Sequence, residues 1–402
     1  MNLQNSMKPK VLNRLRLILL NSANSFLLPL GTMLISMLLV RYKSAALYGE
    51  LAFILILFDF AFNIISWGDS GYLFRQFSLK PATIEPAWQQ SFTSRIPLPL
   101  LFCLVVAFTA YSIKIKLCLC IWIVSRYVYR SCDVLFQYNR NYKAQLLIEL
   151  VGIVFLVLPI LIYLDKLTFS SLVLLYTFSA SLKTGLALFY YKNIFSLLSF
   201  KMRSTSYFIS AFPFLLITFS GMLESKADLY GVAYFLNKEE LGKYQVLSGF
   251  LGFSQLGASL LLAPFGKNMF RLPLKTFKKV EALFAKSGIL FSFIFVLGIY
   301  VALQFIYVIH LPLHMYAIAY LYVIPSFFYL PSLFACSKQN KQSTIVFITL
   351  MGSVANLLLG YFLTPLFRKE GALVAGAFTQ WLIFILFICL RNRNQNFFRL
   401  KW

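Results

Sequence analysis

The chain has 402 residues, of which 60% are hydrophobic, 18% aromatic and only 12% charged, and its mean hydropathy is +0.76. This composition excludes an ordinary soluble domain and predicts an integral membrane protein. Lys and Arg outnumber Asp and Glu by 37 to 13. Because the basic residues lie between apolar runs, the excess indicates membrane orientation and no nucleic-acid partner.

The apolar runs predict an all-α protein with twelve transmembrane helices, each long enough to span the hydrocarbon core. The first six are expected at 15–40, 45–67, 90–112, 117–139, 144–164 and 168–191. The second six are expected at 206–236, 241–264, 284–308, 315–336, 343–366 and 371–390. A basic connection around 192–203 separates the two sets, so we expect an N-terminal six-helix lobe over 1–195 and a C-terminal one over 196–402. The remaining connections are too short for a soluble catalytic domain.

The distribution of Lys and Arg predicts that both termini are cytoplasmic, since basic residues favour cytoplasmic loops. With this orientation 24 of the 37 fall in cytoplasmic segments, Arg75, Lys80 and Arg95 among them, and nine fall in outer connections. Four basic residues then lie within the spans: Arg126, Arg130, Lys183 and Lys226. Charges inside hydrocarbon are costly and usually face a bundle interior or a wet cavity, so these four are candidates for a cationic lumen.

The helix at 117–139 carries Arg126, Arg130 and Asp133 at i, i+4 and i+7, which places them on one face. In one interpretation Arg130 and Asp133 pair locally and join helices. In the other the face meets an anionic ligand, and this is favoured because Arg126 has no carboxylate within one turn of its own helix. Lys183 lies deep in the next helix but one, where it faces the lumen or extends along the helix to the membrane surface.

Acidic residues in the helix at 206–236 are candidates for coupling or gating. Glu224 and Asp228 share a face at i, i+4 spacing, whereas Lys226 points elsewhere. Two carboxylates this close in a low dielectric can bind a proton near neutral pH. The alternative is that each forms a structural ion pair with a base on another helix. Asp59 in the second helix is a third candidate, with hydrogen bonding between helices as its competing interpretation.

Catalytic and metal-binding motifs are absent from the sequence. The six cysteines fall in apolar stretches without a C-x-x-C pair, and His310 and His314 have no third ligand nearby. The chain also has no phosphate-binding loop and no G-x-S-x-G motif. We therefore expect no metal, no cofactor and no enzymatic or ATP-driven activity.

Four segments share a pattern that goes beyond composition. They are LLVRYKSAALYGELAF and NIISWGDSGYLFRQFS near the start, KADLYGVAYFLNKEELGKYQVLS in the middle and ANLLLGYFLTPLFRKEGALVAGAFTQ near the end. The positions that carry the pattern are Tyr48, Gly49, Asn63, Gly68, Arg75, Asp228, Leu236, Gly242, Tyr244, Pro264, Asn356, Pro365, Gly371 and Ala372. In this pattern the chain resembles the Wzx-like O-antigen and polysaccharide flippases of the multidrug/oligosaccharidyl-lipid/polysaccharide (MOP) exporter superfamily. Trp67 and Asp69 depart from the Tyr and Phe more usual there.

The resemblance implies a MATE-like fold of two six-helix lobes around a central cavity that opens alternately to either side of a bacterial inner membrane. The implied cargo is an oligosaccharide unit on undecaprenyl pyrophosphate, and the implied partners are membrane lipids, a polysaccharide polymerase and a chain-length regulator. Arg126 and Arg130 would then bind phosphate first, because Arg can bind it in a bidentate manner, with Lys183 and Lys226 assisting. The resemblance also allows coupling to protons or sodium at Glu224 and Asp228.

Two other classes of protein stay open. A polytopic polysaccharide polymerase or ligase is expected to carry a large periplasmic loop, whereas the longest outer connection predicted here has about seven residues. A small-molecule exporter of the same superfamily that carries cations is expected to have an acidic cavity, whereas this chain places four basic residues in its spans.

Overall fold

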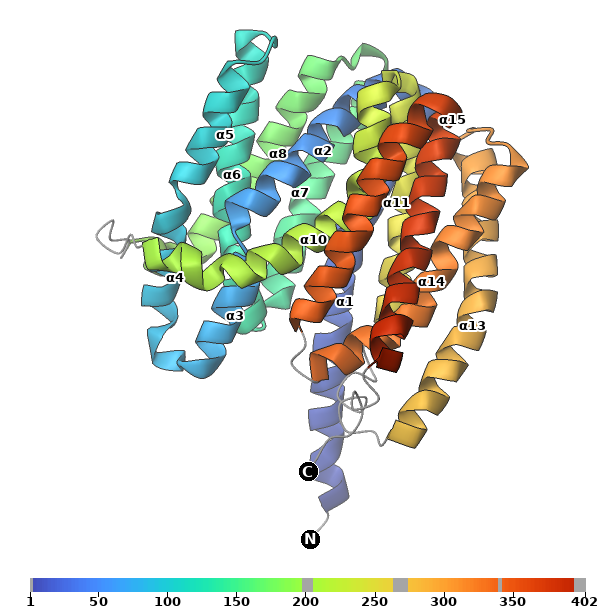
Figure 1. Ribbon diagram of the computed structural model, residues 1–402. Coiled ribbons are helices and arrows are strands. Elements are labelled where there is room, and N and C mark those ends of the chain that lie inside the picture. Colours follow the sequence, from blue (N-terminus) through green and yellow to red (C-terminus); the bar gives the residue numbers. More distant parts are fainter. Residues whose placement is uncertain (1–2, 197–204, 263–273, 339–341, 394–402) are drawn as a thin grey trace. The chain divides into compact units, whose positions relative to one another are not determined.

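The computed structural model describes residues 3–196, 205–262, 274–338 and 342–393, and every regular element in these ranges is helical (Figure 1). The first part of the chain forms α1 (Leu3–Tyr42), α2 (Ala45–Ser66), α3 (Asp69–Leu79), α4 (Ile84–Arg95), α5 (Pro97–Ala107), α6 (Ile113–Tyr138), α7 (Tyr142–Ile162), α8 (Phe169–Tyr190) and α9 (Lys192–Ser196). The rest forms α10 (Thr205–Phe235), α11 (Lys238–Leu262), α13 (Leu274–Val301), α14 (Leu313–Lys338) and α15 (Gln342–Arg393). The all-helical prediction is confirmed.

Nine helical stretches within the described ranges are long and apolar enough to cross a membrane. The multi-pass membrane architecture is therefore confirmed. One of these stretches runs from Ser343 to Leu390, and inside it Arg368 has non-helical angles (φ 54°, ψ −137°) that divide α15 into two helices. Neither α6 nor α11 is among the nine. The predicted count of twelve stays a prediction.

The region 68–89, expected as a hydrophilic connection, is largely helical. It contains α3, a 3₁₀ turn at Pro81–Thr83 and the first half of α4, and α4 leads through Ile96 directly into α5. The charged side chains of this region, Arg75, Lys80 and Glu85, are exposed, whereas Gln89 at its end and Ser91 and Arg95 just beyond it are buried. Arg95, assigned from the sequence to a cytoplasmic connection, is only 2% exposed.

The chain folds into two compact units. Unit 1 comprises Met1–Lys43 and Leu57–Thr218, and unit 2 comprises Ser44–Ile56 and Phe219–Trp402. Of the three boundaries, the one after Lys43 falls between α1 and α2, and the other two fall inside α2 and inside α10. Unit 2 thus includes Ser44–Ile56, from before residue 195, and unit 1 extends beyond residue 195 to Thr218. The predicted lobes 1–195 and 196–402 stay a prediction.

Within unit 1, α6 packs against α8 and α5, while α7 packs against α1 and α8 (Figure 1). Within unit 2, α14 packs against α11, α13 and α15. Small residues allow these helices to approach closely. A Cβ at Gly31 would lie 2.9 Å from Ile153 Cδ1, and one at Gly288 would lie 2.4 Å from Phe327 Cβ. Close backbone approach at small residues is how membrane helices associate where no hydrophobic driving force exists between them.

The closest approach in unit 2 joins the first half of α2 to the start of α11. A Cβ at Gly49 would lie 1.6 Å from the carbonyl oxygen of Lys238, and one at Gly242 would lie 2.2 Å from that of Ala45. The Lys238 ammonium also lies 3.6 Å from the centre of the Phe53 ring. Only glycine leaves room for two backbones at this distance. The contact therefore gives a physical reason for both glycines of the sequence pattern.

Candidate functional site

Two of the predicted site residues, Arg126 and Asp59, contact each other in unit 1. Arg126 Nη2 on α6 lies 3.1 Å from Asp59 Oδ1 on the second half of α2. The Arg126 guanidinium also lies 4.5 Å from the centre of the Phe62 ring. The two charged side chains are 21% and 40% exposed, so the pair is accessible. Asp59 supplies the carboxylate that Arg126 lacks on its own helix.

Arg130 lies one turn further along α6, and its side chain is exposed. Within the described ranges, no ion pair includes Arg130. Asp133, the partner in one interpretation of this face, instead accepts a hydrogen bond of 3.4 Å from Gln145 Nε2. The face of α6 thus carries one guanidinium that contacts a carboxylate and one, Arg130, that is exposed and beyond ion-pair distance of Asp133, although the two charges still act on each other.

Lys183 on α8 is directed into unit 1. Its Nζ lies 3.3 Å from Glu149 Oε2 on α7 and 5.2 Å from the centre of the Tyr129 ring. The stem of the side chain crosses α7 at Gly152, where an added Cβ would lie 2.5 Å from Lys183 Cδ. Glycine at this position lets the ammonium group reach Glu149, so Lys183 forms a half-buried ion pair within unit 1.

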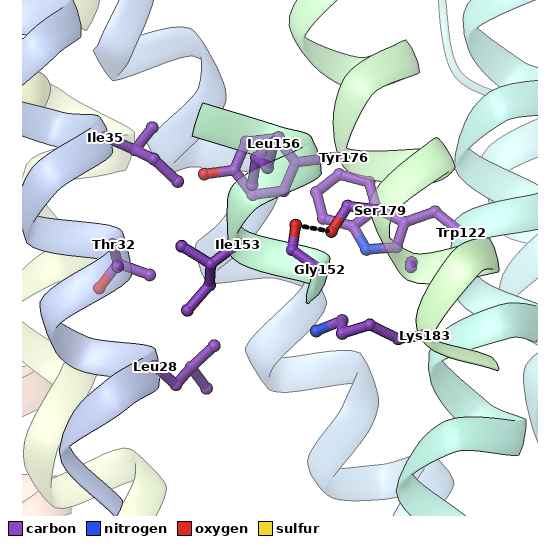
Figure 2. Close-up of a pocket in the computed structure, with 12 residues that line it drawn as sticks. Leu28, Thr32, Ile35, Trp122, Gly152, Ile153, Leu156, Tyr176, Ser179 and Lys183 are labelled. Carbon is purple, nitrogen blue, oxygen red and sulfur yellow. Dashed lines mark hydrogen bonds between the residues drawn. The ribbon is translucent and has the colours of Figure 1, made fainter. Parts of the chain in front are cut away.

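A cavity of about 80 Å³ lies beside Lys183, enclosed by α1, α6, α7 and α8 (Figure 2). Its walls are mostly apolar, with Leu28 and Ile35 from α1 and Trp122 from α6. Ser179 donates a hydrogen bond of 2.8 Å to the carbonyl oxygen of Gly152 at its rim (Figure 2). Because Lys183 is neutralised by Glu149, this cavity offers shape and apolar surface rather than free charge.

A buried ion pair that the sequence analysis missed also lies in unit 1. Arg95 Nη2 lies 2.8 Å from Asp69 Oδ2, and the two side chains are 3% and 5% exposed. Ser91 and Tyr207 both donate to Asp69 Oδ1, while Arg95 donates to the carbonyl oxygen of Ser91 and to Ser131 Oγ. The network joins α3, α4, α6 and α10. An ion pair whose charged atoms are buried and hydrogen-bonded in this way has a structural role. Loss of one partner would leave the other charge buried and uncompensated, which is strongly destabilising.

One signal in the sequence pointed to this pair. Asp69 is a departure from the sequence pattern, and it directly follows Gly68, whose φ of 69° ends α2 and starts α3. A carboxylate at such a turn requires a basic partner if it is buried. The partner, Arg95, is 26 positions away on α4, and the sequence analysis had assigned it to a cytoplasmic segment.

In unit 2, the half-buried Glu224 and the buried Asp228 on α10 accept hydrogen bonds from neutral side chains. Glu224 Oε1 accepts from Tyr329 Oη at 3.3 Å and from Gln380 Nε2 at 3.2 Å. Asp228, which is 1% exposed, accepts from Tyr244 Oη at 2.6 Å, and its Oδ1 has no partner. In the described part of the chain neither carboxylate has a Lys or Arg within ion-pair distance.

Lys226 and the two histidines lie apart from these contacts. Lys226 is half-buried on α10, and the described residues give it no ion pair. His314 Nε2 lies 3.1 Å from Glu370 Oε1, at the exposed end of α14. No cluster of three His, Cys, Asp or Glu residues suited to a metal occurs among the residues that the structure describes.

Comparison with known proteins finds matches in structure only. No family model and no curated protein sequence matches the chain. An inward-facing multidrug resistance MATE family transporter of the MOP superfamily has a TM-score of 0.70 and 9% identity, over 92% of this chain and 94% of that one. The lipid II flippase MurJ, in an inward closed conformation, has a TM-score of 0.66 and 11% identity, over 93% of this chain and 87% of that one. The MATE multidrug transporter DinF-BH has a TM-score of 0.55 and 15% identity, over 98% of this chain and 97% of that one.

These identities are low, so the likeness concerns the fold. All three of these proteins are membrane transporters or flippases by their descriptions. The chain has the fold of the MOP superfamily transporters.

Proposed function

We propose that the protein is a flippase that moves undecaprenyl-pyrophosphate-linked oligosaccharide units across the bacterial inner membrane by alternating access. The observation that carries the proposal is Arg130, an exposed guanidinium with no carboxylate within ion-pair distance in the described ranges, on α6 of this fold. A lipid-linked pyrophosphate is a ligand that such a group binds strongly, because Arg donates two parallel hydrogen bonds to one phosphate. The likeness to a lipid II flippase supports the same class of cargo.

The proposed topology has twelve spans and cytoplasmic termini. The nine apolar stretches supply ten of the proposed membrane spans, because α15 is divided at Arg368 and counts as two. The other two are α6 and α11, which have 26 and 25 residues and so exceed the length needed to cross a bilayer. Their charged and polar residues lower their hydropathy, and in α6 those residues are the proposed ligands themselves.

The basic residues divide into two groups under this proposal. Arg126 and Lys183 are held by Asp59 and Glu149, whereas Arg130 and Lys226 have no such partner in the described part of the chain. We propose that Arg130 makes the first phosphate contact and that Arg126, oriented by Asp59, makes the second. Asp59 thus belongs with the cationic face of α6 rather than with the acidic residues of α10.

We propose that Glu224 and Asp228 couple transport to a proton or sodium gradient. Both carboxylates accept hydrogen bonds from neutral side chains and lie beyond ion-pair distance of a base in the described ranges, so a proton or a monovalent cation would neutralise them. The proposed partners, a polysaccharide polymerase and a chain-length regulator, would act on the cargo after it has crossed.

Deletion in the native bacterium tests the proposal. The measurement is the amount of lipid-linked repeat unit on each face of the inner membrane, together with polymer at the cell surface. Accumulation on the cytoplasmic face with loss of surface polymer is the expected result. Single units that reach the outer face without being polymerised would point to a polymerase instead. Unchanged glycan with increased sensitivity to cationic drugs would point to a small-molecule exporter.

A further inference from the structure

The hairpin formed by α5 and α6 brings two cysteines face to face. The two helices lie side by side and are joined at one end by residues 108–112 (Figure 1). Cys103 Sγ lies 3.8 Å from the carbonyl oxygen of Cys120, and Cys120 Sγ lies 3.8 Å from that of Cys103. Since each sulfur reaches the other residue's backbone, the two side chains point at one another across the interface.

We propose that Cys103 and Cys120 form a redox-active thiol pair that is oxidised to a disulfide across this hairpin. A disulfide needs two Cα atoms within about 7 Å and Cβ vectors that converge. The reciprocal contacts indicate this arrangement. Cys132 offers a contrast on the same helix, because its thiol donates at 3.5 Å to the carbonyl oxygen of Val128 one turn back and so points along its own helix.

The position of the pair in the hairpin allows access from one side of the membrane. Cys103 lies four residues before the end of α5 and Cys120 seven residues after the start of α6. At 1.5 Å per residue the sulfurs lie about 6–10 Å from the ends of the helices, near the depth of the headgroup region. Both side chains are half-buried. Lys116 Nζ donates to the carbonyl oxygen of Ala107 at 2.8 Å, which already holds the two helix ends together.

The side on which this connection lies decides the redox state, and here the inference rests on the topology in the proposed function. With cytoplasmic termini, the connection at 108–112 faces the periplasm, where disulfides form and persist. In the opposite orientation the cytoplasmic thiol pool would keep both cysteines reduced.

The oxidation is an exchange with an external disulfide, such as that of a periplasmic thiol oxidoreductase. One thiolate of the pair attacks a sulfur of the donor, forms a mixed disulfide and releases the donor's other sulfur as a thiolate. The second thiolate of the pair then attacks its neighbour's sulfur and releases the donor's remaining thiolate. Two thiols of this chain lose two protons and two electrons, and the donor disulfide becomes a dithiol. The product ties α6, which carries Arg126 and Arg130, to α5.

Counting free thiols in the full-length protein tests this inference. Cells are quenched with acid, and the denatured protein is treated with maleimide-polyethylene glycol, which adds one resolvable step in a gel for each free thiol. The chain has six cysteines. We expect four labels without reductant and six after reduction. Cys103→Ser should give five in both conditions, whereas the matched control Cys118→Ser should give three and five.

Six labels without reductant in the wild type would overturn the inference, as would a difference of two thiols that persists in Cys103→Ser. If that variant fails to accumulate, a non-reducing digest of the wild type decides instead: a linked peptide pair containing Cys103 and Cys120 is required. Transport is not part of the readout, so a negative result leaves the proposed cargo and flipping activity untouched and bears only on the thiol pair and on the orientation of the connection at 108–112. Conversely, a chain that fails to flip glycan but shows the disulfide would retain this inference.

Discussion

Arg126 and Asp59 are 67 positions apart in the sequence, yet their side chains meet at 3.1 Å between α6 and α2. One turn further along α6, Arg130 has no comparable partner in the ranges described. Two guanidinium groups on one helical face thus differ in availability. The pair supplies a fixed cation, and its neighbour supplies one that is free to bind.

Because Arg130 is the guanidinium without a carboxylate at ion-pair distance, we expect its replacement to impair cargo binding. Arg130→Ala should reduce flipping by about 10- to 100-fold, because a charge-assisted hydrogen bond contributes about 1.5–3 kcal/mol. Arg130→Lys should restore part of the activity, since Lys keeps the charge but not the bidentate geometry. The measurement is glycan delivery to the periplasmic face at matched protein level. The control is Lys166→Ala, which removes an exposed basic residue on a connecting segment. Equal loss of flipping in Arg130→Ala and Lys166→Ala would contradict the role of Arg130 in phosphate binding.

The buried pair of Asp69 and Arg95 should be required for stability rather than for cargo binding. Removing one partner leaves the other charge buried and unpaired, so Asp69→Ala or Arg95→Ala should destabilise the protein by about 3–5 kcal/mol. The double variant Asp69→Leu with Arg95→Met should recover much of this loss, because it removes both charges. Thermal unfolding in detergent, followed by size-exclusion chromatography, measures the change. Single variants as stable as the wild type would exclude a structural role.

The glycine contact between α2 and α11 gives a prediction with an internal control. Gly242→Ala should prevent close packing, since its Cβ would lie 2.2 Å from the carbonyl oxygen of Ala45. Gly249 lies two turns along the same helix with nothing within 4 Å of an added Cβ. Gly249→Ala should therefore be neutral or stabilising by up to about 1 kcal/mol, the difference in helix propensity. Yield of folded protein and melting temperature decide the matter, and similar behaviour of the two variants would refute the contact.

The acidic residues of α10 should carry the response to the driving gradient. Glu224→Gln and Asp228→Asn preserve shape and hydrogen bonding but cannot gain or lose a charge. We expect flipping that no longer varies with the imposed pH or sodium gradient in vesicles. Tyr234→Phe, at an exposed position on the same helix, is the control. A gradient response of wild-type size in both amide variants would assign Glu224 and Asp228 to structural hydrogen bonding only.

Much of the fold follows from hydropathy alone, because spans bounded by charged loops leave little freedom. The helices predicted at 144–164 and 168–191 are α7 (Tyr142–Ile162) and α8 (Phe169–Tyr190). The helices α3 and α4 in and after the connection at 68–89 were not predicted, because a helix that buries polar side chains such as Gln89 and Arg95 has the same composition as a loop. Partners such as Asp59 for Arg126 and Glu149 for Lys183 come from different helices. Spacing along one helix shows which face a charge occupies, but not what lies opposite.

The exchange of helical segments between the two units bears on how the chain can be assembled. A protein cut at 195/196 would leave unit 1 without Thr205–Thr218 and unit 2 without Ser44–Ile56. The second fragment would then lack Ala45, whose carbonyl oxygen packs against Gly242. During synthesis the C-terminal unit completes its packing by recruiting a segment made more than 160 residues earlier, the interval between Ile56 and Phe219. The two units are therefore expected to mature together, and neither should persist as a folded fragment on its own.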